Sequence, residues 1–374
     1  MTTIETGIVA EIESERPKYP VGLLSRHQKD VLIERGIVGL YRWYVARSQA
    51  TRNWNPHQSF DWRAMRTDHS PGLNQILEGF YAVEQYVPDY VRKLLNVVRK
   101  SYGRCQFQVR WGSEEQKHTE AWLNTLLFSR HRTAGWIRDY QQSLYNTEWP
   151  LPWEDPLHML LYTLIQERAT QLNYLNTAAI ARGLSDRPEF RDDSDPVLDR
   201  VCRTIATDEA AHYNFFLEAA RLYFYYYPAR ACEALVDVIK HFAMPAGDVI
   251  PDFKQFEEVM YRSGVFGPRQ YVDDVLQVVI KNLGLRGNKA LIAGLRRSRM
   301  VPDPHGNPRD TALFEAIDYA ALQNAIQRLH GRISDFEQET GLADVDPTMF
   351  VASGLLPPVP DARGEFATEG IAAN

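Results

Sequence analysis

The sequence predicts an all-α fold in a single large helical domain, and three observations support this prediction. Apolar residues recur at three- and four-residue spacing from about residue 25 to 283, which is the period of a buried helical face. Alternating, strand-like runs are scarce. The chain has 374 residues, 44% of them hydrophobic, and no solenoid-type repeat divides it. One sizeable core is therefore expected.

The helices expected in the first third of the chain begin at recognisable signals. Ser70 can cap a helix and Pro71 suits its first turn, while an irregular link, TRNWNPHQSFDW, precedes them. Pro88 lies inside the same segment, and its ring clashes with the carbonyl of Glu84 in a regular helix, so we expect a kink there. The helices are expected over about 25 to 48, 72 to 101 and 106 to 130.

The later helices repeat a start signal made of an aspartate followed by a proline. Asp155 precedes one such proline and Asp195 precedes another, so each supplies a capping carboxylate before a first-turn proline. Gly183 lies just past the end of the first of these helices. The helices are expected over about 156 to 182, from 196 into the aromatic run YFYYY, from Pro228 onwards and over 310 to 338.

Composition and charge exclude several classes of protein. The formal net charge of −6 gives no overall attraction for nucleic acid or an anionic membrane. Three single cysteines, without CxxC spacing, indicate neither a disulfide framework nor a thiolate zinc site. The acidic N-terminus lacks the pattern of an import signal, and the longest apolar run, near LHMLLYTLI, is too short to span a bilayer. We expect a cytoplasmic protein with no membrane span and no nucleic-acid partner.

Two Glu-x-x-His pairs interrupt otherwise apolar helical stripes. Glu115 and His118 form the first pair, and Glu209 and His212 the second; residues three apart share one face of a helix. A buried carboxylate costs several kcal/mol unless it is neutralised, paired or bound to a cation. Such pairs also arise by chance, so their place in the chain has to decide what they mean.

Glu84 and Glu167 fall on the apolar stripes of two further expected helices. The chain order is then Glu, Glu-x-x-His, Glu, Glu-x-x-His, which is the ligand pattern of ferritin-like di-iron four-helix bundles. Four carboxylates and two neutral imidazoles carry −4, which two ferrous ions balance, and this mixed ligand set suits iron or manganese. Taken singly, each histidine could be a hydrogen-bonded core residue and each glutamate could pair with arginine or lysine.

Several short motifs resemble those of the soluble acyl-acyl carrier protein desaturases, ferritin-like enzymes of plastids and some bacteria. The resemblance covers roughly residues 45 to 285, and QERAT together with DExxH and MPA makes it specific. Its motifs are NWNPHQSF (53–60), EQYVP (84–88), RWGSEEQKH (110–118), QERAT (166–170), NTA (176–178), ATDEAAH (206–212), MPA (244–246) and SGVFGPRQYVDDVLQVVI (263–280).

The resemblance implies a centre of two iron ions, ferrous in the reduced form. It implies that Glu115 and Glu209 face both ions, and that Glu114 and Asp208 accept hydrogen bonds from the two imidazoles. It places Thr170 beside the dioxygen site and suggests Trp54 for electron entry. The residues implied as ligands are Glu84, Glu115, His118, Glu167, Glu209 and His212.

The implied function is an oxygen-dependent desaturase that introduces a cis double bond into a saturated fatty acyl chain. The resemblance implies an acyl carrier protein thioester as substrate, a ferredoxin-like electron donor and a homodimer. An acidic carrier predicts a basic patch, for which two clusters qualify: Arg92, Lys93, Arg99, Lys100 and Arg104; and Arg296 with Arg297. The residues expected to line an apolar acyl channel are Tyr81, Trp122, Leu164, Tyr174 and Phe216.

Three other functions fit part of the pattern. A related di-iron oxygenase could hydroxylate or otherwise oxidise another carrier-bound or CoA-bound chain. A ferritin-like storage protein would use a similar site, although the long chain argues against a compact cage subunit. A helical scaffold would have to bury six ionisable groups without metal. In domain terms, we expect a flexible segment at 1–24, a ferritin-like desaturase domain at 25–345 and an extended or disordered tail at 346–374.

Overall fold

The computed structural model describes residues 24–287, 314–342 and 355–356, and these residues form an all-α fold, as predicted. Its one sheet is a short antiparallel pair of strands, β1 (Leu285–Gly287) and β2 (Phe314–Ile317). The longer helices are α2 (Arg26–Trp43), α3 (Pro71–Glu84), α4 (Val87–Val97), α5 (Tyr102–Phe128), α6 (Ala134–Leu144), α7 (Pro156–Ala181), α8 (Pro196–Tyr226), α9 (Pro228–His241), α10 (Phe253–Ser263) and α14 (Tyr319–Thr340). A composite helix follows α10 and consists of α11 (Pro268–Gln270), a π-helical segment (Tyr271–Leu276) and α12 (Gln277–Asn282).

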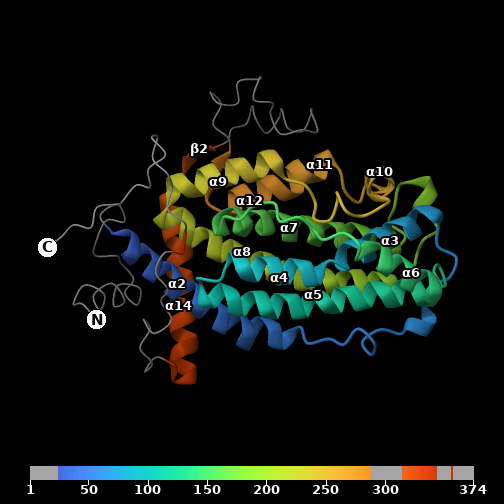
Figure 1. The fold of residues 1–374 in the computed structure, drawn as a ribbon, viewed down its shortest axis with the longest axis horizontal. Coiled ribbons are helices and arrows are strands. Elements are labelled where there is room, and N and C mark those ends of the chain that lie inside the picture. Colours follow the sequence, from blue (N-terminus) through green and yellow to red (C-terminus); the bar gives the residue numbers. More distant parts are fainter. Residues whose placement is uncertain (1–23, 288–313, 343–354, 357–374) are drawn as a thin grey trace.

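The long helices run side by side along the longest axis of the molecule (Figure 1), where α5, α7 and α8 form the centre of a bundle. The predicted caps hold: the Ser70 hydroxyl accepts from the Leu73 amide, and the carboxylates of Asp155 and Asp195 each accept from two first-turn amides. The apolar faces of these helices pack into two hydrophobic clusters, the larger including Phe107, Leu164 and Phe216 and the smaller including Leu77, Trp122 and Ile205. Caps and periodicity together fix how far each helix extends.

The helix expected over 72 to 101 is interrupted rather than kinked. α3 ends at Glu84 and α4 begins at Val87, with Pro88 in its first turn. Pro88 has no N–H to donate to the Glu84 carbonyl, which instead accepts a hydrogen bond of 2.8 Å from the Thr119 hydroxyl of α5. The predicted strain at Glu84 is therefore relieved by ending the helix, and α5 anchors the end.

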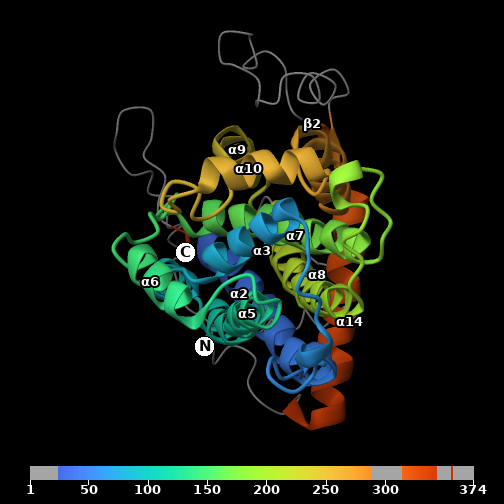
Figure 2. The ribbon, with the colours of Figure 1, turned by 90° about the vertical axis from the view of Figure 1, so that its right-hand side faces the viewer.

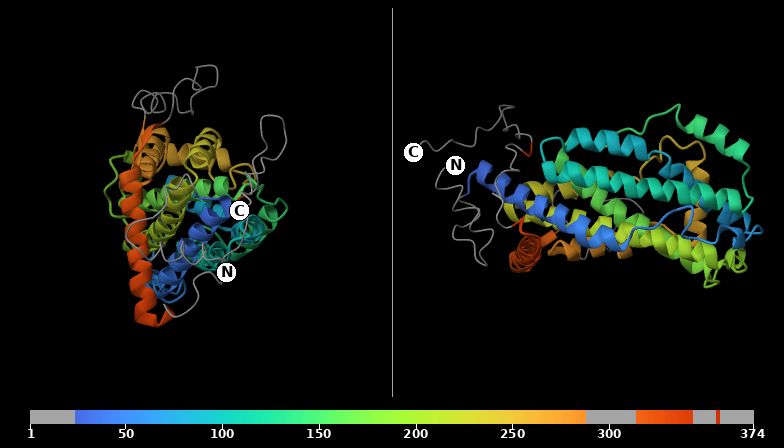
Figure 3. Two further views of the ribbon diagram at one scale, coloured as in Figure 1. Left: turned by 90° about the vertical axis from the view of Figure 1, so that its left-hand side faces the viewer. Right: turned by 90° about the horizontal axis from the view of Figure 1, so that it is seen from below.

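The later helices cover the bundle on one side and at one end. In Figure 2, α9 and α10 form a layer beside α3 and α7. α14 crosses the bundle against the C-terminal half of α2 and is seen end-on in the right panel of Figure 3. A buried two-pronged ion pair between Arg35 and Glu337 ties α14 to α2.

Other details depart from the expected elements. α6 and α10 were not predicted, and residues 314–317 form a strand where the start of a helix over 310 to 338 was expected. Apart from Leu24, the expected flexible segment 1–24 lies outside the described residues, and so does the tail 346–374 except residues 355–356. Among the helices described, none combines the length and the apolar character that crossing a membrane requires.

Candidate metal centre

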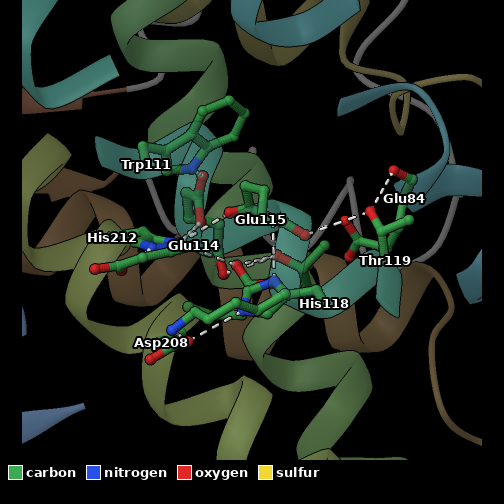
Figure 4. Close-up of polar contacts among 12 residues, drawn as sticks. Glu84, Trp111, Glu114, Glu115, His118, Thr119, Asp208 and His212 are labelled. Carbon is green, nitrogen blue, oxygen red and sulfur yellow. Dashed lines mark hydrogen bonds and ion pairs between the residues drawn. The ribbon is translucent and has the colours of Figure 1, made fainter. Parts of the chain in front are cut away.

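Six ionisable side chains meet in the middle of the bundle (Figure 4), each nearly or fully buried. They come from four helices: Glu84 ends α3, one Glu-x-x-His pair lies on α5, Glu167 lies on α7, and the other pair lies on α8. They are the six residues singled out in the sequence, namely Glu84, Glu115, His118, Glu167, Glu209 and His212.

The six residues form two overlapping groups of four potential ligands. Glu84 and His118 belong to one group, Glu167 and His212 to the other, and the potential ligand atoms of each group lie within 4.8 Å of one another. Glu115 and Glu209 belong to both groups. This arrangement provides two adjacent cation sites that share two carboxylates.

Both histidines are oriented by carboxylates behind them. Nδ1 of His118 faces the cluster, 3.0 Å from Glu115 Oε2, while its Nε2 lies 3.3 Å from Asp208 Oδ2. His212 is arranged alike, with Nε2 2.7 Å from Glu114 Oε2. The pairing is crossed, because each acid belongs to the helix opposite its histidine. A proton on each Nε2 leaves each Nδ1 lone pair directed into the cluster.

Arg52 joins the two acids behind the histidines. Its Nη1 donates to Glu114 at 2.9 Å and to Asp208 at 2.6 Å, and its side chain is only 8% exposed. The hydroxyl of Tyr44 donates to Glu114 at 2.6 Å, and Lys117 lies 3.3 Å from Asp208. Two buried negative charges are thus compensated by cations outside the cluster.

Neutral donors support the glutamates on the other side of the cluster. The Tyr174 hydroxyl donates to Glu84 Oε1 at 2.6 Å, and the Trp111 indole donates to Glu167 Oε1 at 2.8 Å. The Thr170 hydroxyl lies 3.1 Å from Glu209 Oε2 and 3.0 Å from the Gln166 carbonyl of its own helix. These contacts orient carboxylates without adding charge.

The electrostatics of the two sides differ accordingly. Burial raises the pKa of Glu84 and of Glu167 well above the ordinary value, and neighbouring carboxylates raise it further. Burial acts in the same direction on Glu114, but the hydrogen bond from His212 and the charge of Arg52 hold its pKa well below the usual range. The acids behind the histidines are therefore ionised.

Three buried atoms indicate that the cluster is built for cations. Glu115 Oε1, Glu167 Oε2 and His212 Nδ1 have no hydrogen-bond partner, although the imidazole nitrogen lies 3.0 and 3.3 Å from the two oxygens. Within the described part of the chain, no lysine or arginine forms an ion pair with the four glutamates of the cluster. Converging lone pairs of carboxylates and imidazoles fit iron, and the simple core-pairing alternative does not account for them.

An apolar cavity of about 430 Å³ reaches the cluster from the surface. Thr170 and Tyr174 lie at its inner end. Its walls are mainly apolar side chains, most of them from residues 242–272, and the exposed Lys240 and Glu257 also line it. Only Tyr174 among the five residues expected to line a channel does so. The other four pack into the core, and they are Tyr81, Trp122, Leu164 and Phe216.

The first expected basic patch is exposed in part: Arg92, Arg99 and Lys100 are exposed, whereas Lys93 is partly buried. Arg92 pairs with Glu148 at 2.8 Å, and Lys93 lies 3.4 Å from the same carboxylate. Arg104 is buried and donates to the Pro156 carbonyl at 2.8 Å. Arg296 and Arg297 lie outside the described residues. Within the described residues, the cluster is thus divided between residues that contact the segments around Glu148 and Pro156 and the exposed pair Arg99 and Lys100.

The sequence pattern missed two supporting residues. Tyr44 begins the π-helical segment Tyr44–Ser48, which follows α2, and Arg52 lies just after that segment. Helical periodicity gives no signal in this region. One clue was available: two acids predicted to be buried behind the histidines required a cation between them. Trp111 was seen only as part of an apolar stripe, although a buried indole N–H also requires an acceptor.

Comparison with known proteins agrees with the geometry. The model of the family described as "Fatty acid desaturase" matches residues 79–299, more than half of the chain. DesA1 of Mycobacterium tuberculosis, which carries the name of an acyl-[acyl-carrier-protein] desaturase, is 24% identical over 250 residues, covering 61% of this chain and 70% of its own. Stearoyl-[acyl-carrier-protein] 9-desaturase 6 of Arabidopsis thaliana, a chloroplastic protein, is 28% identical over 214 residues, covering 53% and 52%.

Among solved structures, that of DesA2 from Mycobacterium tuberculosis aligns with a TM-score of 0.47 and 18% identity, covering 69% of this chain and 97% of that one. The relatives named above confirm the predicted resemblance to acyl-acyl carrier protein desaturases. With its family model spanning residues 79–299, the chain belongs to the fatty acid desaturase family.

Proposed function

We propose that this protein is an oxygen-dependent di-iron desaturase that acts on a saturated fatty acyl chain carried as a thioester on acyl carrier protein. One observation carries the proposal: two four-ligand groups sharing Glu115 and Glu209 lie at the inner end of an apolar cavity. The names of the relatives support the carrier-bound substrate. The six clustered residues would hold the two iron ions.

Iron is required because an unactivated C–H bond has no acidic proton for a side chain to remove. When bound, the iron pair supplies oxidation by dioxygen, and the protein supplies position. Overall, the acyl chain loses one hydrogen from each of two adjacent methylenes, and one dioxygen is reduced to two waters. The balance requires two electrons and two protons in addition, for which we propose a ferredoxin-type donor as the electron source.

The chain's own residues have distinct roles in this proposal. The apolar cavity binds the acyl chain and excludes water, which keeps the centre in a medium of low dielectric. Glu114 and Asp208 fix the two imidazoles, and Thr170, whose hydroxyl lies at the boundary between cavity and cluster, is placed to hold or pass a proton.

The opposite side of the cluster supports an entry point for electrons. The Trp54 ring is parallel to that of His118 within 6°, with centroids 6.1 Å apart, and its indole donates to Asp208 at 2.8 Å. A surface cavity of about 410 Å³ opens beside Trp54 and is lined in part by Arg200 and Arg203. An acidic donor would be attracted to these arginines.

The test is a reconstitution of the purified, iron-loaded protein. Incubation with ferredoxin, its reductase, dioxygen and saturated acyl carriers is expected to give a mono-unsaturated product that depends on iron and on oxygen. A hydroxylated product would favour the related oxygenase instead. Iron uptake far beyond two ions per chain, without turnover, would favour storage. Acyl-CoA thioesters tested in parallel separate the two carriers.

A homodimer and a cytoplasmic location belong to the same proposal. They rest on the sequence resemblance, and the absence of a membrane-crossing helix from the described residues is compatible with them. Sedimentation of the purified protein tests the first, and fractionation of the cells that make it tests the second.

A further inference from the structure

The wall of the apolar cavity is mostly hydrocarbon, but it also contains polar side chains. Thr170 and Tyr174 are engaged with the ligand cluster, because their hydroxyls contact carboxylates there. Lys240 and Glu257 are exposed, so water solvates their charges. The polar groups of these four residues are therefore satisfied either by the cluster or by solvent.

Asn173 and Tyr271 also line this cavity, and each contains a buried polar atom without a hydrogen-bond partner. Asn173 of α7 is only 4% exposed, and its Oδ1 accepts no hydrogen bond from the described residues. The hydroxyl of Tyr271 likewise has no partner in the part of the chain that the structure describes. Such atoms are costly to bury, and each of them calls for an explanation. A polar group brought in by a ligand would supply the missing partner.

Asn173 lies close to the ligand cluster. It follows Thr170 by three residues on α7, which is about 4.5 Å along the helix axis. Thr170 lines the same cavity and contacts Glu209. Rotation about the last side-chain bond of Asn173 exchanges the two ends of its amide, so the group can present a donor or an acceptor to the cavity. A ligand group bound there lies within a few carbon atoms of the cluster.

Tyr271 is held in place by packing. Its ring stacks on that of Phe242 with centroids 5.2 Å apart and planes 16° apart, and Phe242 also lines the cavity. Burial raises the pKa of Tyr271 well above the ordinary value, so its hydroxyl stays protonated and can donate. Tyr271 begins the π-helical segment Tyr271–Leu276, and such segments are rare and frequent at functional sites.

The two partnerless atoms differ in the hydrogen bond that each requires. The Tyr271 hydroxyl can donate, whereas Asn173 Oδ1 can only accept. A thioester carbonyl lies at the carrier end of an acyl chain and accepts only, so it would leave Asn173 Oδ1 without a donor. A hydroxyl group accepts and donates, and it can therefore pair with either residue.

Resting on the proposed function, we propose that Asn173 and Tyr271 form a polar subsite of the apolar cavity, which binds a hydroxyl group carried by the acyl chain. The substrate class is then a saturated hydroxyacyl chain on its carrier, with the hydroxyl close to the carbons that are oxidised. A chain without the hydroxyl leaves the buried polar groups without partners, and this is the basis of discrimination.

Binding of acyl carriers to the iron-loaded protein, measured without reductant so that no turnover occurs, tests the subsite. The probes share one chain length and carry a single hydroxyl that is moved along the chain, with the unsubstituted chain as reference. At one position, or at two adjacent positions, the hydroxyl is expected to lower the Kd about fivefold for each hydrogen bond gained. Equal affinities throughout the series would overturn the inference.

Substitutions in the cavity wall give an independent test. Tyr271→Phe and Asn173→Leu remove the polar groups at similar volume, and each is expected to reduce the preference for the hydroxylated chain about fivefold without weakening the unsubstituted one. Tyr223→Phe is the matched control, because this buried tyrosine belongs to the core and does not line the cavity. It should retain the preference.

Two results with these variants would contradict the subsite. One is a preference for the hydroxylated chain that survives both Tyr271→Phe and Asn173→Leu. The other is an equal loss of affinity for the hydroxylated and the unsubstituted chains, because a group common to both, such as the thioester, would then be the partner.

Product analysis separates this inference from the proposed function. The preferred hydroxylated chain is expected to be desaturated with a higher kcat/KM than the unsubstituted chain, by the same factor as in binding. Desaturation of both chains with equal kcat/KM and equal affinity would keep the desaturase and overturn the subsite. A hydroxyl-dependent affinity without product from any chain would reject the desaturase and keep the subsite.

Discussion

The two sides of the ligand cluster are stabilised by different physics. Behind the histidines lies a charged network that we call the arginine side, formed by Arg52, Tyr44, Glu114 and Asp208. The other side carries neutral contacts, and we call it the cavity side because two of its donors, Tyr174 and Thr170, line the apolar cavity. There, Tyr174, Trp111 and Thr170 meet Glu84, Glu167 and Glu209.

This difference indicates which side chains of the ligand cluster are held rigidly and which can change position. On the arginine side, each acid is ionised and held by at least one cation, so the imidazoles are confined to one tautomer and one orientation. On the cavity side, Glu84, Glu167 and Glu209 each accept a hydrogen bond from one neutral group. Ligand rearrangement during turnover is therefore expected among Glu84, Glu167 and Glu209, and not among the histidines.

The largest effect should follow from removing a carboxylate that both sites share. Glu115→Gln is expected to lower bound iron from about two ions per chain to one or fewer, and activity by more than the roughly 10- to 100-fold typical of a supporting residue. Metal analysis and turnover measure this. Glu120→Gln on the same helix, outside the cluster, should retain both ions. Full iron occupancy in Glu115→Gln would show that the two groups do not share a ligand.

Removing the cation of the arginine side should come next. Arg52→Ala leaves two buried carboxylates without their common partner, and such a loss typically lowers the free energy of unfolding by about 3 to 5 kcal/mol. Arg47→Ala is the matched control, because Arg47 pairs with Glu339 where both side chains are more than half exposed. This substitution should lower the free energy of unfolding by only about 0 to 1 kcal/mol. Urea titration of both variants measures the contrast. An equal decrease in the free energy of unfolding in both variants would mean that Arg52 is not essential to the arginine side.

A partly buried histidine, His330, shows what happens without an acid partner. His330 of α14 has a buried Nε2 with no hydrogen bond; burial, with the nearby charge of Arg35, lowers its pKa to about 4. Below pH 6.5 the unfolded chain binds a proton that the folded chain rejects. Stability should fall as the pH drops toward 4, by about 2 kcal/mol at pH 5 relative to neutral pH. Denaturation of wild type and His330→Leu at both values checks this, and equal pH slopes would contradict it.

The smallest effect should arise on the cavity side. Tyr174→Phe removes the hydroxyl that orients Glu84 and is expected to weaken iron binding about fivefold, because a single neutral hydrogen bond contributes about 1 kcal/mol. Competition with a chelator measures the affinity. Tyr271→Phe, at a buried hydroxyl with no partner, should leave iron affinity unchanged. A loss of iron affinity in Tyr174→Phe as large as that in Glu115→Gln would contradict the modest contribution expected from a single neutral hydrogen bond.

Sequence reasoning located the cluster because its information is local. Spacing of three residues places Glu115 with His118 and Glu209 with His212, and the capping signals at Asp155 and Asp195 delimit α7 and α8. Helical periodicity then predicts which side chains turn inward. The order of the motifs along the chain supplied the rest of the bundle.

Other features could not be predicted, since they depend on packing between distant segments. Arg52 reaches the acids from an irregular turn, and its place is set by tertiary contacts. The break after Glu84 was predicted only as a kink, because periodicity does not reveal that Thr119 would satisfy the freed carbonyl. The channel residues were misplaced for a similar reason: helical spacing distinguishes inside from outside, but it does not distinguish a core from a cavity wall.

Asp208 pairs with His118, and Glu114 pairs with His212. Because both pairs join α5 to α8, both depend on the axial alignment of these two helices. An axial slip of one residue, about 1.5 Å, would misalign both imidazoles at once. An insertion or deletion within the Glu-x-x-His motif of α5 or α8 should therefore disrupt both acid–histidine pairs, unless a matching change in the other helix restores the alignment. The geometry of the ligand cluster therefore depends on the axial alignment of α5 with α8.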